Sequence, residues 1–175
     1  MAVFFPFSFY GYIFVTEGFD PHTVLASPLQ VVQCTTPFDG EVAEAISRSY
    51  SYGGSGSQSF CCISDDGRYV VKFFKSMRQK DRFYEYLFFP SYRKVIRKRR
   101  NEANQAAHMS SIIAHKELRS ETALLALHLG TEPCATKQLP VRDRLGRLHM
   151  IDLNRANFVI QKRAIPTSEW LTKAR

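Results

Sequence analysis

No lysine or arginine precedes Arg48, so the first quarter of the chain is free of strongly basic side chains. A secretory signal needs a positively charged start and a cleavage site between small residues, and the apolar N-terminus shows neither. The apolar run of residues 2–15 is also shorter than the roughly 20 residues that span a bilayer, and Pro6 and Gly11 interrupt it. We expect an aromatic strand or packing arm there, with an interfacial anchor or the end of a longer membrane segment as the alternative.

Cysteine is scarce, with Cys34, Cys61, Cys62 and Cys134 as the full set. None of them forms a C-x-x-C pair, and no histidine lies at zinc-ligand spacing from them. Cys61 and Cys62 would point to opposite faces of a strand, so they could not hold one metal together. We therefore predict no metal site, and reduced thiols in a cytoplasmic protein that could associate with a membrane.

The positive charge is concentrated in one segment. The whole chain carries a net charge of +8, but residues 72–100 contain eleven lysines and arginines against Asp81 and Glu85. The densest part, "YRKVIRKRR", follows the aromatic stretch "RFYEYLFF" at residues 82–89. Such a segment can bind an anionic membrane surface, bind nucleic acid, or form a solvated helix. The cations concerned are Arg93, Lys94, Arg97, Lys98, Arg99 and Arg100.

Short strands and tight turns follow an irregular lead-in of residues 1–44. "ISRSYSY" alternates like a strand, and "QSFCCIS" and "RYVVKFFK" flank the turn Asp65-Asp66-Gly67, which is a strong hairpin signal. The glycine-serine stretch at residues 53–59 would then join two strands of an antiparallel meander. Inter-domain linkers do not usually lie inside such a ladder, so we do not expect this stretch to be one.

Residues 101–129 have the composition of a helix, with Asn101 as a cap and Gly130 as a stop. Three strand-like pieces follow: "ATKQLPV", "RLHMIDL" and "NFVIQKRA". We therefore predict an α+β fold, in which a twisted antiparallel sheet of about five strands carries one long helix. This domain would cover residues 45–175, with a basic insertion at about 76–100.

The order strand, glycine loop, strand, tight turn, strand with an internal lysine, and helix resembles the N-terminal lobe of protein-kinase-like proteins. "GSGSQSFC" at residues 54–61 stands where that family has G-x-G-x-x-G-x-V, with Ser59 in place of the third glycine. "YVVKFF" stands where it has V-A-I-K, which puts Lys72 at the phosphate-binding lysine. The style of these motifs is similar to that of a group of kinase-like proteins in chlamydiae.

This resemblance implies an ATP site. Glycines let the backbone approach phosphates and offer N–H donors, and a lysine on the facing strand adds a point charge. A glutamate on the helix would hold that lysine, with Glu121 as the first choice and Glu117 as the second. The implied cofactor-binding residues are Gly54, Gly56, Ser57, Gln58, Ser59, Lys72, Glu121, Gln161 and Arg163, the last two in a hinge that meets the adenine.

Phosphotransfer does not follow from the resemblance. Kinase-like folds place the catalytic base and the magnesium ligands in a C-terminal lobe, and no H-R-D-x-x-x-x-N or D-F-G sequence follows the hinge. Either the chain is part of a longer protein, with a C-lobe or partner supplied separately, or it is a degenerate lobe. We expect it to bind ATP without catalysis, and we do not expect Mg²⁺ without a C-lobe. The alternative is a non-catalytic binding module that uses the basic aromatic segment 82–100.

Overall fold

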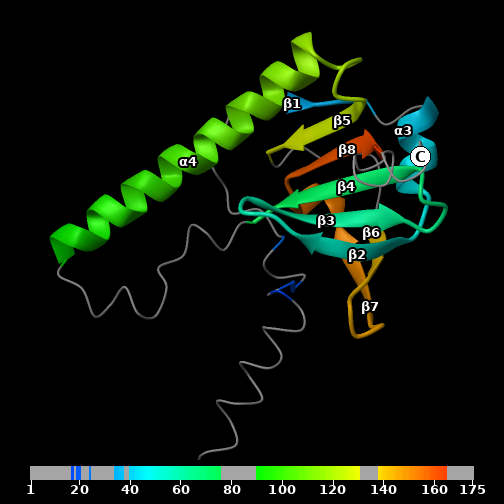
Figure 1. The fold of residues 1–175 in the computed structure, drawn as a ribbon, viewed down its shortest axis with the longest axis horizontal. Coiled ribbons are helices and arrows are strands. Elements are labelled where there is room, and N and C mark those ends of the chain that lie inside the picture. Colours follow the sequence, from blue (N-terminus) through cyan, green and yellow to red (C-terminus); the bar gives the residue numbers. More distant parts are fainter. Residues whose placement is uncertain are drawn as a thin grey trace, which may run out of the picture.

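The computed structural model describes most of the chain outside its two ends. The described residues are Glu17, Phe19, Asp20, Val24 and the ranges 34–37, 40–75, 90–130 and 138–164. The predictions for the apolar residues 2–15, for Cys134 and for the first part of the basic insertion, residues 76–89, lie outside them. Within the described residues, the structure consists of one sheet, a short helix and a long helix (Figure 1).

The sheet has eight strands in the order β1-β5-β8-β4-β3-β2-β6-β7. All neighbours are antiparallel except β2 and β6, which run parallel. The strands are β1 (Cys34–Thr35), β2 (Tyr50–Ser55), β3 (Ser59–Ser64), β4 (Tyr69–Phe74), β5 (Leu124–Leu129), β6 (Gln138–Arg142), β7 (Leu148–Asp152) and β8 (Phe158–Lys162). The helices are α3 (Gly40–Ile46) and α4 (Pro90–Glu117), and a 3-10 turn, η3 (Leu153–Arg155), precedes β8.

The predicted hairpin around residues 65–67 is confirmed. β3 and β4 are antiparallel neighbours, and Gly67 has a φ of 71°, a left-handed conformation that glycine adopts without strain. The Ser64 hydroxyl donates to the Asp66 carboxylate at 2.7 Å, and the backbone N–H of Arg68 donates to the same carboxylate oxygen at 3.0 Å. The glycine-serine stretch joins β2 to β3, so it lies inside the sheet as predicted.

The predicted helix boundaries were wrong. α4 begins at Pro90 and ends at Glu117, and "LLALHL", expected at the end of the helix, forms strand β5. All six residues of β5 are buried, because the strand has apolar neighbours on both faces of the sheet. A short, continuously apolar run cannot be assigned to helix or strand from its pattern alone. Ala123, with a φ of 50°, turns the chain into β5.

The α+β class with one long helix on a sheet is confirmed, but the sheet is larger than the predicted five antiparallel strands. The lead-in contributes β1 and α3, and the β6–β7 hairpin adds two strands at the free edge of β2. Leu139, Val141 and Ile151 of this hairpin are almost completely buried. Burial of these side chains explains why the hairpin joins the sheet. The alternating sequence pattern predicted neither that β6 pairs with β2 nor that the two strands run parallel.

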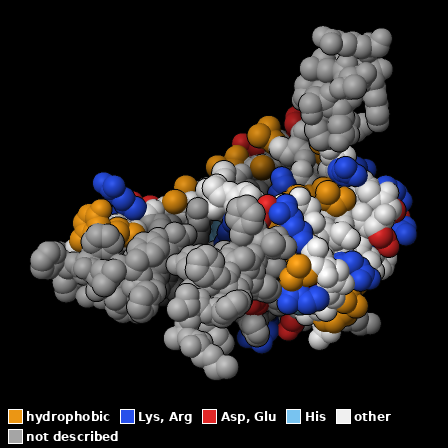
Figure 2. Space-filling model, turned by 60° about the horizontal axis from the view of Figure 1, so that its bottom comes forward, with side chains coloured by type: hydrophobic (Ala, Val, Ile, Leu, Met, Phe, Trp, Pro, Cys, Tyr) orange, Lys and Arg blue, Asp and Glu red, His pale blue; other side chains and the backbone are white. Residues whose placement is uncertain are grey.

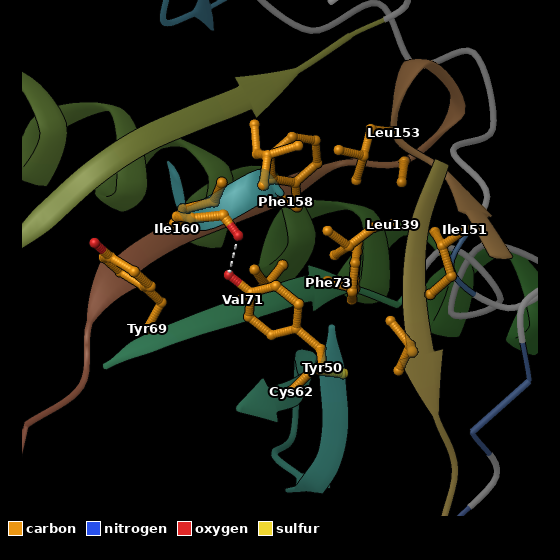
Figure 3. Packing of buried hydrophobic residues seen from close by; sticks show 14 of the residues in the cluster. Tyr50, Cys62, Tyr69, Val71, Phe73, Leu139, Ile151, Leu153, Phe158 and Ile160 are labelled. Carbon is orange, nitrogen blue, oxygen red and sulfur yellow. Dashed lines mark hydrogen bonds between the residues drawn. The ribbon is translucent and has the colours of Figure 1, made fainter. Parts of the chain in front are cut away.

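The main core lies on the face of the sheet opposite α4 (Figure 3). Val71 and Ile160 are paired across β4 and β8, and Phe73 and Phe158 are fully buried beside them. α3 belongs to this layer, because the Tyr50 hydroxyl donates to the backbone oxygen of Ala45 at 2.9 Å. A second, smaller cluster fills the space between the sheet and α4; its buried members are Ile112, Leu124, Leu127, Leu129 and Val159.

A buried carboxylate organises the turn between β6 and β7. Asp143 accepts hydrogen bonds from the backbone N–H groups of Leu145 and Arg147, each at 2.9 Å. It also accepts one from Arg147 Nε at 2.7 Å, and it pairs with His149 Nε2 at 2.9 Å. Burial opposes ionisation, but the contacts with His149 and Arg147 outweigh it and lower the pKa of Asp143 to about 2.

Asp143 should therefore contribute to stability in a pH-dependent way. Because its pKa in the folded chain lies below the usual 3.8, the carboxylate stabilises the fold above about pH 4, and this contribution is lost as the pH falls toward 2. We expect Asp143→Asn to lower the free energy of unfolding by about 2 kcal/mol at pH 7. Denaturant titrations between pH 7 and pH 2 measure the free energy of unfolding of both proteins. The difference in this free energy between Asp143→Asn and wild type should become smaller below pH 4.

Asp65→Asn is the matched control. Asp65 is exposed in the β3–β4 turn, where its carboxylate accepts one hydrogen bond, from the N–H of Asp66. Its substitution should change the free energy of unfolding by no more than about 0.5 kcal/mol. If the free energy of unfolding of Asp143→Asn differed from that of wild type by the same amount down to pH 2, the stabilisation would not come from the ionised carboxylate.

Candidate functional site

Lys72 lies in the middle of the sheet. Its strand, β4, has β3 on one side and β8 on the other, and Lys72 pairs with Cys61 and Val159. Lys72 is therefore not a charge on an edge strand. Because side chains alternate along a strand, Val71 and Phe73 enter the main core, while Lys72 lies on the face that α4 covers. There its side chain is half-buried.

A pocket of about 410 Å³ lies between this face of the sheet and α4. The sheet contributes Lys72, Phe74 and Val159, and the start of β3 contributes Ser59, next to Gln58 of the glycine loop. The pocket brings together four of the residues predicted for a nucleotide site: Gln58, Ser59, Lys72 and Gln161. The other lining residues are Ser110, Ser111, Ala114, Thr122 and Leu124.

The glycine loop is a tight turn at residues 56–58. The backbone N–H of Gly56 donates to the backbone oxygen of Ser59 at 2.8 Å, which closes the turn. Lys75 holds the loop from the next strand: its ammonium donates to the Ser55 hydroxyl and to the Gly56 carbonyl, the latter at 2.6 Å. The same ammonium lies 4.6 Å from the centre of the Phe60 ring. Sequence analysis did not single out Lys75, which fixes the loop more directly than Lys72 does.

Gly53 and Gly56 of the loop are subject to different structural constraints. At Gly53 an added Cβ would come within 3.0 Å of the Ile63 side chain, so packing within the protein restricts this position. At Gly56 the backbone does not require glycine, and the nearest atom to an added Cβ, the Ser59 oxygen, would be 3.5 Å away. The fold therefore does not need glycine at position 56, where an added Cβ would make an ordinary contact with the Ser59 oxygen.

The two candidate glutamates lie apart from the pocket. Glu121 follows the end of α4; it is exposed, and its carboxylate accepts a hydrogen bond from the Ser120 hydroxyl at 2.7 Å. Glu117, the last residue of α4, lines a different hollow together with Lys116, Arg119 and Lys162. On the side of α4 that faces Lys72 stand Ser110 and Ser111, whose hydroxyls donate to the Ala107 carbonyl. Among the residues that the structure describes, no carboxylate pairs with Lys72.

The remaining predicted residues do not line the pocket, and Gly56 is one of them. Gly54 belongs to β2, at an irregularity in its pairing with β3, and Ser57 is exposed at the tip of the loop. Arg163 follows β8, and its backbone N–H donates to the Arg68 carbonyl at 2.8 Å. None of these three lines the pocket next to Lys72.

Cys61 is the cross-strand neighbour of Lys72 and is half-buried. Burial raises the pKa of the Cys61 thiol, an effect that the positive charges of Lys72 and Arg163 only partly offset. Cys62, on the opposite face, is fully buried in the main core, where burial also raises its pKa. The prediction that these adjacent cysteines point to opposite faces is confirmed, and both thiols are free.

Sequence analysis missed the contribution of α4 to the pocket. Ser110 and Ser111 interrupt an otherwise apolar run, "AAHMSSIIA", and two hydroxyl side chains inside such a run were a signal that part of this face is not tightly packed. The helix positions them because His108 packs edge-on against Phe74 at 4.8 Å and Ile112 is buried in the cluster under α4. These contacts fix α4 on either side of the two serines.

Two further properties of the described residues bear on function. They contain no group of three or more His, Cys, Asp or Glu side chains arranged to hold a metal ion. No helix among them is long and apolar enough to cross a membrane.

Comparison of the chain with protein-family models, with curated proteins and with solved structures found no match.

We expect Lys75→Met to loosen the glycine loop while the sheet remains folded. The substitution keeps much of the apolar stem but removes the donor to Ser55 and Gly56. Amide hydrogen exchange at residues 56–58 should become several-fold faster, since local opening costs less free energy. Exchange within β4 and β8 should not change.

Lys98→Met, on the exposed part of α4, is the control for loss of a positive charge. It should leave exchange in the loop as in wild type. Equal exchange at residues 56–58 in the Lys75→Met variant and in wild type would show that Lys75 does not hold the loop.

Proposed function

We propose that the pocket between α4 and strands β3, β4 and β8 binds a nucleoside triphosphate such as ATP. The observation that carries this proposal is the meeting of Gln58, Lys72 and Gln161, which are far apart in the sequence, around one pocket. Its volume of about 410 Å³ lies within the usual range for small-molecule sites, roughly 300–1,000 Å³. In this proposal the chain is a nucleotide-binding lobe.

Electrostatics favour an anionic ligand. A half-buried ammonium loses part of its hydration, and a nearby negative charge stabilises it. No carboxylate is among the described residues that line the pocket, so the phosphates of a ligand would supply that charge. The Ser59 hydroxyl is a further group in the lining that can donate to phosphate oxygens. Ser110 and Ser111 would have to turn their hydroxyls away from the Ala107 carbonyl to do the same.

The two ends of the pocket suit the two parts of a nucleotide. The glycine loop lies next to Ser59, and the absence of a side chain at Gly56 would let the backbone there approach a phosphate. Leu124 offers apolar surface for a base, and its cross-strand partner Gln161 adds an amide that can donate and accept. The phosphates would therefore lie under the loop and the base toward β8.

The resemblance to a kinase N-terminal lobe is consistent with this arrangement but suggests binding only. The serines at positions 110 and 111 stand on the side of α4 where the resemblance implies a glutamate, so Lys72 would depend on the ligand for its counter-charge. The proposal does not include phosphotransfer by this chain alone. A C-lobe, or a partner protein that supplies equivalent groups, would have to provide a base and metal ligands.

Calorimetric titration of the purified chain with ATP, with and without Mg²⁺, tests the proposal. Two variants remove the proposed contacts without removing core packing. Lys72→Ala deletes the cation and should weaken binding by at least about tenfold, as expected for a charge-assisted contact. Gly56→Ala should leave the fold intact, because position 56 has room for a Cβ, but should weaken binding by crowding the phosphates.

Lys98→Ala is the control for loss of a lysine elsewhere, since Lys98 is exposed on α4. It should bind ATP like wild type. Absence of binding at millimolar ATP would overturn the proposal. ATP binding that is unchanged in Lys72→Ala but weaker in Lys98→Ala would also overturn the proposal.

A further inference from the structure

α4 has two different long faces. Ala107, His108 and Ile112 are buried against the sheet, and His115 Nε2 contacts the Thr36 hydroxyl at 3.0 Å. These contacts come from the second half of the helix. The first half extends past the edge of the sheet (Figure 1).

The opposite face of α4 carries a stripe of exposed apolar side chains. Residues three and four positions apart share a helix face, and this spacing connects Ala106, Met109 and Ile113. Val95 lies on the same face about three turns before Ala106, with Glu102 between them. Val95, Met109 and Ile113 are 48%, 48% and 47% exposed, and Tyr92, one turn before Val95, is 53% exposed. We call Tyr92, Val95, Met109 and Ile113 the outer stripe.

Basic side chains lie beside the first part of the outer stripe. Lys94, Lys98 and Arg99 are exposed within three turns of the helix start, and Lys98 is 3.9 Å from Glu102, which lies in line with the stripe. The first turn of α4 contains no acidic residue, although negative charge there would stabilise a helix. Helix stability therefore does not explain this concentration of cations. Figure 2 shows hydrophobic side chains following one another along the upper left edge, with basic side chains at its left end.

We propose that α4 lies on an anionic lipid surface, with the outer stripe at the headgroup boundary and Lys94, Lys98 and Arg99 against lipid phosphates. Flanking cations and low overall hydrophobicity are typical of an interfacial helix. α4 has both, and the outer stripe adds exposed apolar side chains. Nucleic acid would satisfy the cations but would leave Met109 and Ile113 without a partner. The proposal does not depend on the nucleotide site, because no residue of the outer stripe lines the pocket.

Co-sedimentation of the full chain with vesicles tests this inference. We expect binding to vesicles of phosphatidylcholine mixed with phosphatidylserine, little binding to phosphatidylcholine alone, and weaker binding at high salt. Replacing Lys94, Lys98 and Arg99 by Gln should lower the partition coefficient by about a hundredfold, because each basic residue near an anionic surface contributes a factor of roughly five. Met109→Glu with Ile113→Glu should also abolish binding.

The β6–β7 hairpin offers a matched control. Leu148 and Met150 are 57% and 50% exposed, so Leu148→Glu with Met150→Glu makes the same change of charge and apolar surface away from α4. This variant should bind vesicles like wild type. Absence of binding to the anionic vesicles, or equal loss in the two Glu variants, would overturn the proposal. A chain that does not bind vesicles could still bind an oligonucleotide. If the substitutions of Met109 and Ile113 left that binding unchanged, the basic side chains would be assigned to nucleic acid instead.

Discussion

The pairing of β4 on both sides determines where the pocket under α4 can be. With β3 and β8 as neighbours, Lys72 cannot turn to solvent at an edge, and the alternation of the strand places its ammonium under α4 instead of in the main core. The same pairing brings the glycine loop next to the lysine through the β3–β4 hairpin, and Gln161 next to it through β8. If β4 lay at the edge of the sheet, these three parts would not share a pocket.

The hairpin elements could be predicted from the sequence because their signals are local. Asp65-Asp66-Gly67 specifies a turn, and the strands on either side alternate over a few residues, so β3, β4 and the position of Lys72 follow directly. The extent of α4 and the identity of β5 could not be predicted in this way. "LLALHL" contains good helix formers, and only its burial on both faces, which depends on α4 and the main core, makes it a strand.

The candidate site shows the same division. The loop residues Gln58 and Ser59, Lys72 and Gln161 could be found from motif order. The serine pair at positions 110 and 111 signalled only that part of the helix is loosely packed, and no motif marked Lys75. Their roles depend on how α4 crosses the sheet and on which atoms the Lys75 ammonium reaches, and neither is encoded in a short pattern. The glutamate predicted to hold Lys72 illustrates the limit, since position 121 lies beyond the helix that would have had to carry it.

α4 connects the two proposals physically. Its inner face forms one wall of the pocket through Ser110, Ser111 and Ala114, and its outer face carries the exposed stripe. A helix held by an external surface would also fix that wall, so membrane contact could change access to the pocket without touching it. This coupling would be reciprocal, because any effect of lipid on ligand affinity implies an equal effect of ligand on lipid affinity.

The most direct test of the central claim is to map which lysine an ATP acyl phosphate acylates. The reagent transfers its acyl group to an amine close to the bound phosphates, and peptide mass spectrometry then locates the modified residue. If the pocket under the glycine loop holds a nucleotide, Lys72 is acylated and excess ATP protects it, while Lys98 is not protected. Acylation spread over the exposed lysines, with no protection of Lys72 by ATP, would contradict the account.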